Sequence, residues 1–346
     1  MTTRRVLVCE DSRVFAAALT RTLEYDGDIT VAAVCATAEE AIAALSRVRP
    51  DLVTMDIDLP GMDGLKAVEE IMSSRPLPIL VLSAQVGSGS DRAAAAALAF
   101  GALDAIAKDN LDLRNPAGAA GAALRQRIKV LCRATVIRHL RAGLKAGPAV
   151  RGRVRRASVI GICASTGGPQ ILARLLHVLP VDYPIPLLVV QHIGAGFAEG
   201  LADWLDQTVR LPVAIARDGM RAGAGAWIAP DGAHLKLSGN GRLSLDRHGP
   251  PGRHRPSGDI LLESIAAAAG PAGVGIVLSG MGADGAAGAA AVRRAGGLAI
   301  AQDRESSAVF GMPRAAIDLG VEVVLAPADI AAALLQLSHQ PLPGCR

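Results

Sequence analysis

The feature that most constrains this sequence is an alternation of short apolar runs with segments of helical periodicity, which occurs twice along the chain. Short apolar runs bounded by polar turns are typical of buried strands, and apolar residues spaced three and four apart are typical of helices. The first series predicts strands at 6–9, 29–34, 52–55, 79–82 and 105–107, with helices at 13–23, 38–45, 65–73 and 92–100. Strands that alternate with helices predict a parallel sheet covered by helices.

A second series begins after residue 156. It predicts strands at 159–163, 187–191, 213–216, 275–278, 298–301 and 321–325, with helices at 170–179, 197–208, 260–268, 286–294 and 329–337. Residues 227–245 predict an inserted hairpin, with turns at Asp231-Gly232 and Asn240-Gly241. The predicted fold class is therefore α/β, with two doubly wound parallel-sheet domains: a flavodoxin-like domain, then a Rossmann-like domain with an inserted β-hairpin.

The length of 346 residues favours two domains over one. We predict a first domain at 1–125, a basic helical linker at 126–156 and a second domain at 157–340. No Asp or Glu occurs between residues 113 and 181, a stretch that holds thirteen of the 36 Lys and Arg residues. Such a segment could bind nucleic acid, anionic lipid or an acidic protein face, or it could be a solvated linker and helix face.

Composition narrows the class of protein further. Hydrophobic residues make up 51% of the chain and charged residues 20%, which excludes a disordered protein. Only eight side chains are aromatic, too few for a binder that stacks nucleic-acid bases. The five cysteines are scattered and never in C-x-x-C spacing, as expected of reduced thiols in the cytoplasm. The N-terminus lacks the pattern of a signal peptide, and the uncharged stretch 264–283 contains Pro271 and reads as helix, turn and strand, so we expect no membrane insertion.

Polar residues follow the predicted strands of the first domain. Glu10 and Asp11 follow the first strand, Asp56 the third, Ser83 the fourth and Lys108 the fifth. Chemistry in an open parallel sheet sits beyond the carboxyl ends of its strands, so these side chains are expected to converge. Three converging carboxylates favour a hard divalent cation such as Mg²⁺. Asp56 could then be phosphorylated, with Ser83 and Lys108 bonding the phosphoryl oxygens.

Residues 4 to about 125 resemble the receiver domain of two-component response regulators. The matching stretches are Glu10-Asp11, residues 55–64 around Asp56, Ser83-Ala84 and Lys108. The resemblance implies that Asp56 is the phosphoacceptor, that Glu10, Asp11 and Asp56 bind Mg²⁺ with the carbonyl of Asp58, and that a cognate sensor histidine kinase is a partner. Asp109 stands where the family usually has Pro, and Ala105 where it often has an aromatic switch residue.

The second domain places three other residue types after its strands. Ser165 follows the strand at 159–163, His192 follows 187–191 and Asp284 follows 275–278. A histidine can take the proton of a serine hydroxyl, and a carboxylate can orient the histidine, so these residues predict a Ser-His-Asp triad. Gly167-Gly168 and Gly280-Met281-Gly282 bring backbone N–H groups close, as an oxyanion site requires. The chain has no G-x-S-x-G elbow and no phosphate-binding P-loop.

This half, from about 157 to 337, resembles the catalytic domain of the chemotaxis protein-glutamate methylesterases, the CheB family. The matching stretches are 164–169, 190–193 with 196–197, 229–235, 255–257, 278–286, 301–303 and 310–313. The resemblance implies hydrolysis of glutamate γ-methyl esters on chemoreceptor cytoplasmic helices, with deamidation of glutamines as a further activity left open. Ser165 would be the nucleophile, His192 the base and Asp284 its orienter, with Thr166 and the Met281 backbone stabilising the intermediate. His234 and Arg255 are weaker candidates for substrate contacts.

Two hypotheses follow for the whole chain. In the first, the esterase is regulated by phosphorylation: the unphosphorylated first domain covers the crevice around Ser165, and removal of residues 1–145 raises the basal activity. In the second, the chain is a DNA-binding response regulator whose C-terminal domain is not catalytic. The absence of a helix-turn-helix pattern after the first domain disfavours the second hypothesis, so no nucleic-acid partner is expected.

Overall fold

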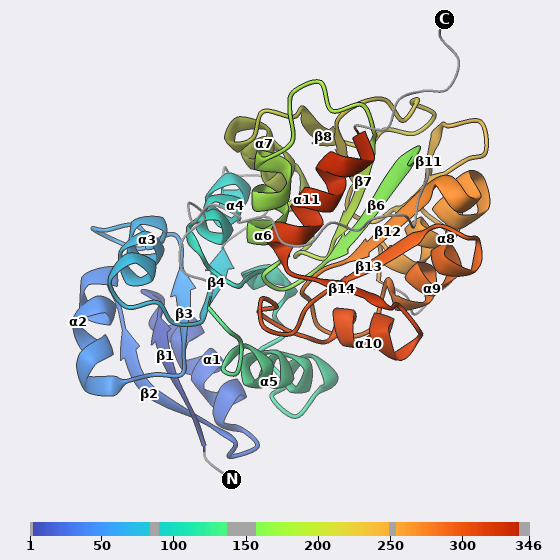
Figure 1. Ribbon diagram of the computed structural model, residues 1–346. Coiled ribbons are helices and arrows are strands. Elements are labelled where there is room, and N and C mark those ends of the chain that lie inside the picture. The colour runs from blue at the N-terminus through green and yellow to red at the C-terminus, as the bar shows by residue number, and fades with distance from the viewer. Residues whose placement is uncertain (1–2, 84–89, 137–156, 249–253, 339–346) are drawn as a thin grey trace, which may run out of the picture. The chain divides into compact units, whose positions relative to one another are not determined.

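The computed structural model describes residues 3–83, 90–136, 157–248 and 254–338 (Figure 1). The chain divides into two compact units: the first comprises residues 1–139 and 193–200, and the second comprises the rest. Most of the expected basic linker, residues 137–156, lies outside the described residues, as does Cys345. Among the described residues, the helices are too short or too polar to cross a bilayer.

The first unit is built on a five-stranded parallel sheet, as the sequence predicts. Its strand order is β2-β1-β3-β4-β5, with every neighbouring pair parallel. The strands lie close to their expected positions: β1 (Arg4–Cys9), β2 (Ile29–Cys35), β3 (Leu52–Asp56), β4 (Ile79–Ser83) and β5 (Asp104–Ala107). The flavodoxin-like arrangement predicted for this unit is therefore confirmed.

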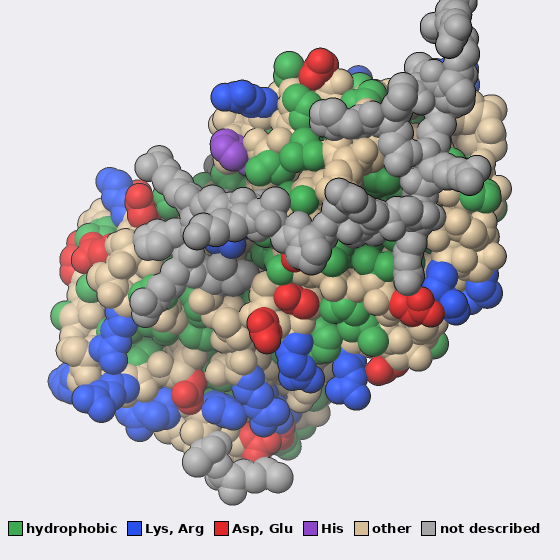
Figure 2. Space-filling model, in the orientation of Figure 1, with side chains coloured by type: hydrophobic (Ala, Val, Ile, Leu, Met, Phe, Trp, Pro, Cys, Tyr) green, Lys and Arg blue, Asp and Glu red, His purple; other side chains and the backbone are tan. Residues whose placement is uncertain are grey.

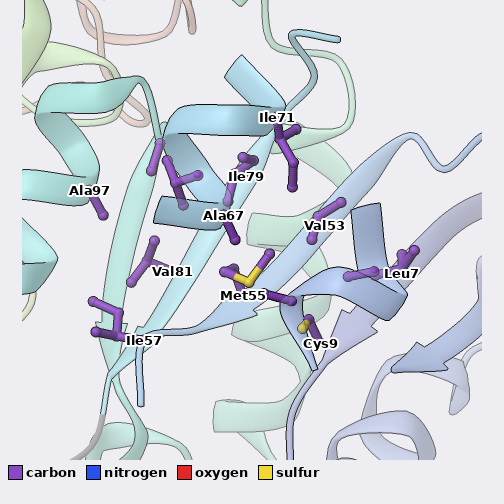
Figure 3. Packing of buried hydrophobic residues seen from close by; sticks show 14 of the residues in the cluster. Leu7, Cys9, Val53, Met55, Ile57, Ala67, Ile71, Ile79, Val81 and Ala97 are labelled. Carbon is purple, nitrogen blue, oxygen red and sulfur yellow. The ribbon is translucent and has the colours of Figure 1, made fainter. Parts of the chain in front are cut away.

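Helices cover both faces of this sheet: α1 (Arg13–Glu24), α2 (Ala38–Val48), α3 (Gly64–Ser74), α4 (Ser90–Phe100) and α5 (Ala119–Leu131). Ser12, Thr37 and Asp63 begin the first three helices, each accepting a backbone N–H with its side chain. Apolar residues of α2, α3 and α4 pack on one face of the sheet, where Met55 and Val81 meet Ala67 and Ala97 (Figure 3). Helices α1 and α5 contact each other on the opposite face.

Helix α5 extends to Leu131, past the boundary expected at residue 125. Three of its basic side chains pair with acids of the same unit: Arg125 with Asp26 at 2.6 Å, Arg127 with Asp104 at 2.7 Å, and Lys129 with Asp28 at 2.9 Å. Figure 2 shows Lys and Arg interspersed with acidic side chains over this part of the surface. Part of the positive charge that the sequence concentrates here is therefore neutralised inside the first unit.

The second unit contains a seven-stranded sheet of order β14-β13-β12-β6-β7-β9-β8. All its pairs are parallel, which confirms the doubly wound fold class. Its strands are β6 (Val159–Ala164), β7 (Leu187–Gln191), β8 (Val213–Ile215), β9 (Ala226–Ile228), β12 (Gly273–Val277), β13 (Leu298–Gln302) and β14 (Val323–Leu325).

The predicted hairpin at 227–245 is only partly correct. Residues 226–228 form β9, which joins the main sheet between β7 and β8, while the antiparallel hairpin is β10 (His234–Leu237) with β11 (Leu243–Asp246). Gly241, with φ 75°, closes the hairpin at the predicted Asn240-Gly241 turn. Strand β9 has only three residues, so its apolar pattern could not be distinguished from the first arm of a hairpin.

The helices of the second unit also cover two faces: α6 (Gly168–His177), α7 (Ala198–Thr208), α8 (Gly258–Ala269), α9 (Ala286–Arg294), α10 (Met312–Asp318) and α11 (Pro327–Ser338). Buried residues of α8, α9 and α10 form one core with Cys163, Val190 and Val277 of the sheet and with leucines of the hairpin. Helices α6 and α11 contact each other on the other face (Figure 1). This packing leaves the carboxyl ends of the strands as the edge from which polar loops emerge.

Candidate functional sites

The acidic residues of the first unit meet where the direction of strand order reverses. Strand β1 lies between β2 and β3, so the loops after β1 and β3 diverge to opposite faces and leave a crevice between them. Glu10 and Asp11 follow β1, and Asp56 is the last residue of β3. One ligand oxygen from each of the three carboxylates lies within 4.8 Å of the others.

Lys108 joins this group from the end of β5. Its Nζ donates to Asp56 Oδ2 at 2.7 Å and to Glu10 Oε1 at 3.0 Å. Burial alone would lower the pKa of Lys108, but the two hydrogen-bonded carboxylates outweigh burial and raise it. Burial raises the pKa of Glu10, and the bond from Lys108 offsets only part of that shift. Ionised Glu10 is therefore only partly compensated by the protein itself.

The residues present fit a hard divalent cation and a phosphoryl group. Glu10 and Asp56 are 2% and 1% exposed, while Asp11 is exposed and open to water, a donor set of carboxylates and water that Mg²⁺ favours. Ser83 is fully buried, and its Oγ has no partner among the described residues. A buried hydroxyl without a partner is costly, so a ligand oxygen at this point would satisfy it.

The residues predicted as a triad in the second unit also follow strands on either side of a reversal of strand order. Strand β6 leads to β7 on one side, whereas β12, its other neighbour, leads to β13 on the opposite side. The last register pair of β6 and β7 is Ala164 with Gln191, so Ser165 and His192 are the next residues on the two strands. His192 N–H donates to the Ala164 carbonyl at 2.8 Å.

Asp284 completes the group, with its Oδ2 at 2.8 Å from His192 Nε2. The same carboxylate accepts from Ser257 Oγ at 2.7 Å and from the backbone N–H groups of Gly258 at 2.6 Å and Asp259 at 3.1 Å. These N–H groups belong to the first turn of α8, where a negative charge is favoured. Burial alone would raise the pKa of Asp284, but the bonds from His192, Ser257 and Gly258 outweigh it and hold the pKa well below 3.8.

His192 is fixed on two sides. Its Nε2 faces Asp284, so Nδ1 is the ring nitrogen left to accept the proton of a hydroxyl. The ring of His254 stacks on it, with centroids 4.5 Å apart and planes at 29°. Neither Ser257 nor His254 was predicted to hold His192 or Asp284. Ser257 occurs in a stretch that the resemblance includes, but no local pattern shows that its hydroxyl reaches residue 284.

The turn that carries Ser165 is tightly held. Gly167 has φ 74° and precedes α6, a backbone that favours glycine. A Cβ at Gly280 would lie 2.6 Å from Ser165 Cβ, so the loop after β12 packs directly on Ser165. Ser279 accepts the Ser165 N–H with its carbonyl at 3.0 Å and donates its hydroxyl to the Thr166 carbonyl at 2.7 Å. Thr166 is buried and Met281 half-buried beside this turn.

Two further residues lie apart from the chemistry. Cys163 is fully buried behind Ser165, packed against Gly258 and Gly285, and burial raises the pKa of its thiol. His234 is 0% exposed, which disfavours the substrate contact expected of it. Burial, followed by the nearby charge of Arg255, lowers the pKa of the His234 imidazole.

The fold and the two sites define a class of protein, a hydrolase joined to a phosphoacceptor domain. Residues 160–334 match the family model described as CheB methylesterase, and residues 6–114 match the response regulator receiver domain. The chain therefore belongs to the CheB methylesterase family, with a response regulator receiver domain ahead of the methylesterase domain. The match to this family, as well as the fold, disfavours the DNA-binding alternative.

Individual relatives agree. The chain is 43% identical to protein-glutamate methylesterase/protein-glutamine glutaminase 2 of Anaeromyxobacter dehalogenans, over 97% of each chain. It is 36% identical to the protein-glutamate methylesterase/protein-glutamine glutaminase of Escherichia coli K12, over 91% of each. The solved catalytic domain of the Thermotoga maritima CheB methylesterase matches 52% of this chain and 98% of its own, with 37% identity and a TM-score of 0.50.

Proposed function

We propose that this chain hydrolyses γ-methyl esters of glutamate residues on the cytoplasmic helices of chemoreceptors and releases methanol. The relatives named above carry this activity in their names. The observation that carries the proposal is the 2.8 Å bond between His192 and Asp284 at the strand ends beside Ser165. Such an arrangement suits acyl transfer to a serine.

In the proposed mechanism, Ser165 Oγ attacks the ester carbonyl and its proton passes to His192 Nδ1. Asp284 stays ionised, holds the tautomer and stabilises the imidazolium. His192 returns the proton to the leaving methoxide, which departs as methanol. Water then attacks the acyl-serine with His192 as base, and His192 returns the proton to Ser165 Oγ as the receptor's glutamate carboxylate is released.

The oxyanion of each tetrahedral intermediate would be held by the backbone around Thr166 and Met281. Both residues flank Ser165, one in its own turn and the other in the loop that packs on it. Preorganised donors at such a position are worth about 3–4 kcal/mol of barrier each. The same chemistry acts on a glutamine amide with ammonia as the leaving group, so we extend the proposal to deamidation, as the relatives' names also include it.

The first unit would regulate this activity through phosphorylation of Asp56 by a cognate sensor histidine kinase. We propose that Glu10, Asp11 and Asp56 hold Mg²⁺, with the Asp58 carbonyl as a further ligand. The cation would neutralise charge on the transferring phosphoryl group. Lys108 and Ser83 would bind the phosphoryl oxygens, Lys108 exchanging its bonds to Glu10 and Asp56 for them. Free thiols at Cys9, Cys35, Cys132 and Cys163 suit the cytoplasmic setting we propose.

The test is methanol release from methylated receptor membranes, measured with and without acetyl phosphate as phosphodonor. Ser165→Ala should lower kcat/KM by at least about 10⁴-fold, because it removes the proposed nucleophile. The exposed Ser158→Ala is the matched control and should retain full activity. Full activity in Ser165→Ala would contradict the proposed site, and a rate unaffected by acetyl phosphate would contradict the proposed regulation.

A further inference from the structure

We infer that Gln191 is a positioning residue that fixes the nucleophile and the base relative to each other through one amide group. The inference rests on the proposed triad and adds to it a residue that touches neither substrate nor reacting atoms. Gln191 is the last residue of β7 and is 5% exposed. Its Nε2 donates to the Ser165 carbonyl at 2.8 Å and to the His192 carbonyl at 2.8 Å.

The two hydrogen bonds from Gln191 lie just beyond the last backbone pair of β6 and β7. The last paired residues of β6 and β7 are Ala164 and Gln191, so Ser165 and His192 lie just past the sheet. A buried carbonyl without a donor is costly. The amide of Gln191 donates one N–H to each of these carbonyls and so continues the connection between the strands by one more step.

The orientation of the amide is determined by its partners. An amide oxygen cannot donate, so turning the group over would place Oε1 against two carbonyl oxygens. In the observed orientation Oε1 lies over the start of α6, where a Cβ at Gly168 would be 2.3 Å away. Glycine at 168 therefore leaves the space that this amide occupies.

The two carbonyls depend on Gln191 to different degrees. The Ser165 carbonyl also accepts the Gly168 N–H at 2.8 Å, which closes the turn into α6. Removing the amide thus leaves the turn closed but releases its connection to the strand that carries His192. We expect the separation of hydroxyl and imidazole to vary more, while the substrate-binding surface stays intact.

Substitution at 191 can separate positioning from folding. Gln191→Met keeps the volume but has no donor, so kcat should fall about 10- to 100-fold with KM unchanged, the cost of a displacement of about 1 Å. Gln191→Glu can donate one bond while it is protonated, and burial between carbonyls favours that form. At low pH its kcat should exceed that of Gln191→Met. As pH rises and the glutamic acid ionises, kcat should fall to the value of Gln191→Met, a decrease that the pH profile of the wild type lacks.

The experiment measures kcat and KM of the full chain on methylated receptor membranes from pH 5 to 9. Gln207→Met, an exposed change on α7, is the control for the substitution, and Ser165→Ala is run in parallel. Unchanged kcat in Gln191→Met, or a loss confined to KM, would overturn the inference. If Gln191→Met does not fold, the inference is overturned instead by a pH profile of Gln191→Glu in which kcat does not fall as the glutamic acid ionises. Activity retained in Ser165→Ala refutes the triad itself, whatever Gln191 does.

Discussion

The two units place their candidate sites at the same kind of position in a parallel sheet, but the carboxylates in the two sites have pKa values shifted in opposite directions. Each places its candidate site residues at the point where strand order reverses, after β1 and β3 in one and after β6 and β12 in the other. In the first unit, buried carboxylates face each other and Lys108, and the pKa of Glu10 is raised. In the second, Asp284 has four hydrogen-bond donors among the described residues, and its pKa is lowered.

The difference shows what each site is arranged to do. Incomplete compensation of charge makes the first site favourable for an added cation. The carboxylate of the second site is already stabilised by four hydrogen bonds. A carboxylate held in this way keeps its charge, which suits the role of orienting His192 that we propose for Asp284. We call the carboxylate site of the first unit, Glu10, Asp11 and Asp56, the receptive site, and the site of Ser165, His192 and Asp284 in the second unit the preorganised site. Both lie where strand order reverses in a parallel sheet.

The largest expected effect comes from removing the charge of the preorganised site. Asp284→Asn should lower kcat by about 10⁴-fold, because an amide no longer selects the tautomer of His192 that accepts the serine proton. Methanol release measures the loss. Asp318→Asn, an exposed change on α10, is the control. A loss of less than tenfold would show that the bond to His192 is not required.

The receptive site should respond in the opposite sense when one charge is removed. Because the pKa of Glu10 is raised from 4.5 in the folded unit, its ionisation destabilises the fold as pH rises through that range. Glu10→Gln should therefore raise the melting temperature without Mg²⁺ at pH 7, and it should abolish the further rise that we expect Mg²⁺ to give the wild type. Thermal unfolding with and without Mg²⁺ measures both effects.

The exposed Glu69→Gln is the control for this change and should keep the response to Mg²⁺. An equal Mg²⁺ response in Glu10→Gln and the wild type would mean that Glu10 does not hold the cation. Chelation of divalent cations should also stop the phosphorylation of Asp56 while leaving the hydrolysis of esters by the second unit unchanged.

A smaller effect is expected at Ser257, which begins α8 and donates to Asp284. Ser257→Ala removes a helix cap and one of the four bonds to the carboxylate, so it should cost about 1–2 kcal/mol of stability and lower kcat about 3- to 10-fold. Ser257→Thr keeps the hydroxyl and serves as the matched control. Equal activity of the two variants would show that the hydroxyl is not needed.

The smallest effect concerns acid stability. The folded pKa of Asp284 lies below its ordinary value of 3.8. Its contribution to stability is therefore complete above about pH 4 and is lost only as pH falls through the lower, folded value. Urea unfolding from pH 2 to 6 should show Asp284→Asn losing this acid dependence. Unchanged dependence in the variant would assign it to other carboxylates.

The residues at the strand ends were predictable because the pattern of apolar residues locates each strand along the chain. Glu10, Asp56 and Lys108 meet in the structure, and Ser165, His192 and Asp284 follow strands that the sequence located within a residue or two. Apolar runs fix the strands, and a parallel sheet then brings their carboxyl ends to one edge. Neither step depends on the orientation of side chains.

The supporting contacts were not predictable in the same way. Ser257 reaches Asp284 across 27 residues of sequence, and His254 stacks on a ring that precedes it by 62 positions. Such contacts depend on how α8 packs beside β12, which no local pattern encodes. Strand β9 was assigned to a hairpin because three apolar residues between turns suit either neighbour equally.

Helix α5 has a consequence for how the protein meets polyanions. Carboxylates of the same unit already pair with Arg125, Arg127 and Lys129. The electrostatic field of each pair decreases with distance more steeply than that of a single charge. Elution from a cation-exchange or heparin column should therefore occur at lower salt than the number of Lys and Arg residues in this stretch suggests. Neutralising Asp26 and Asp28 together would release two of these cations and delay elution.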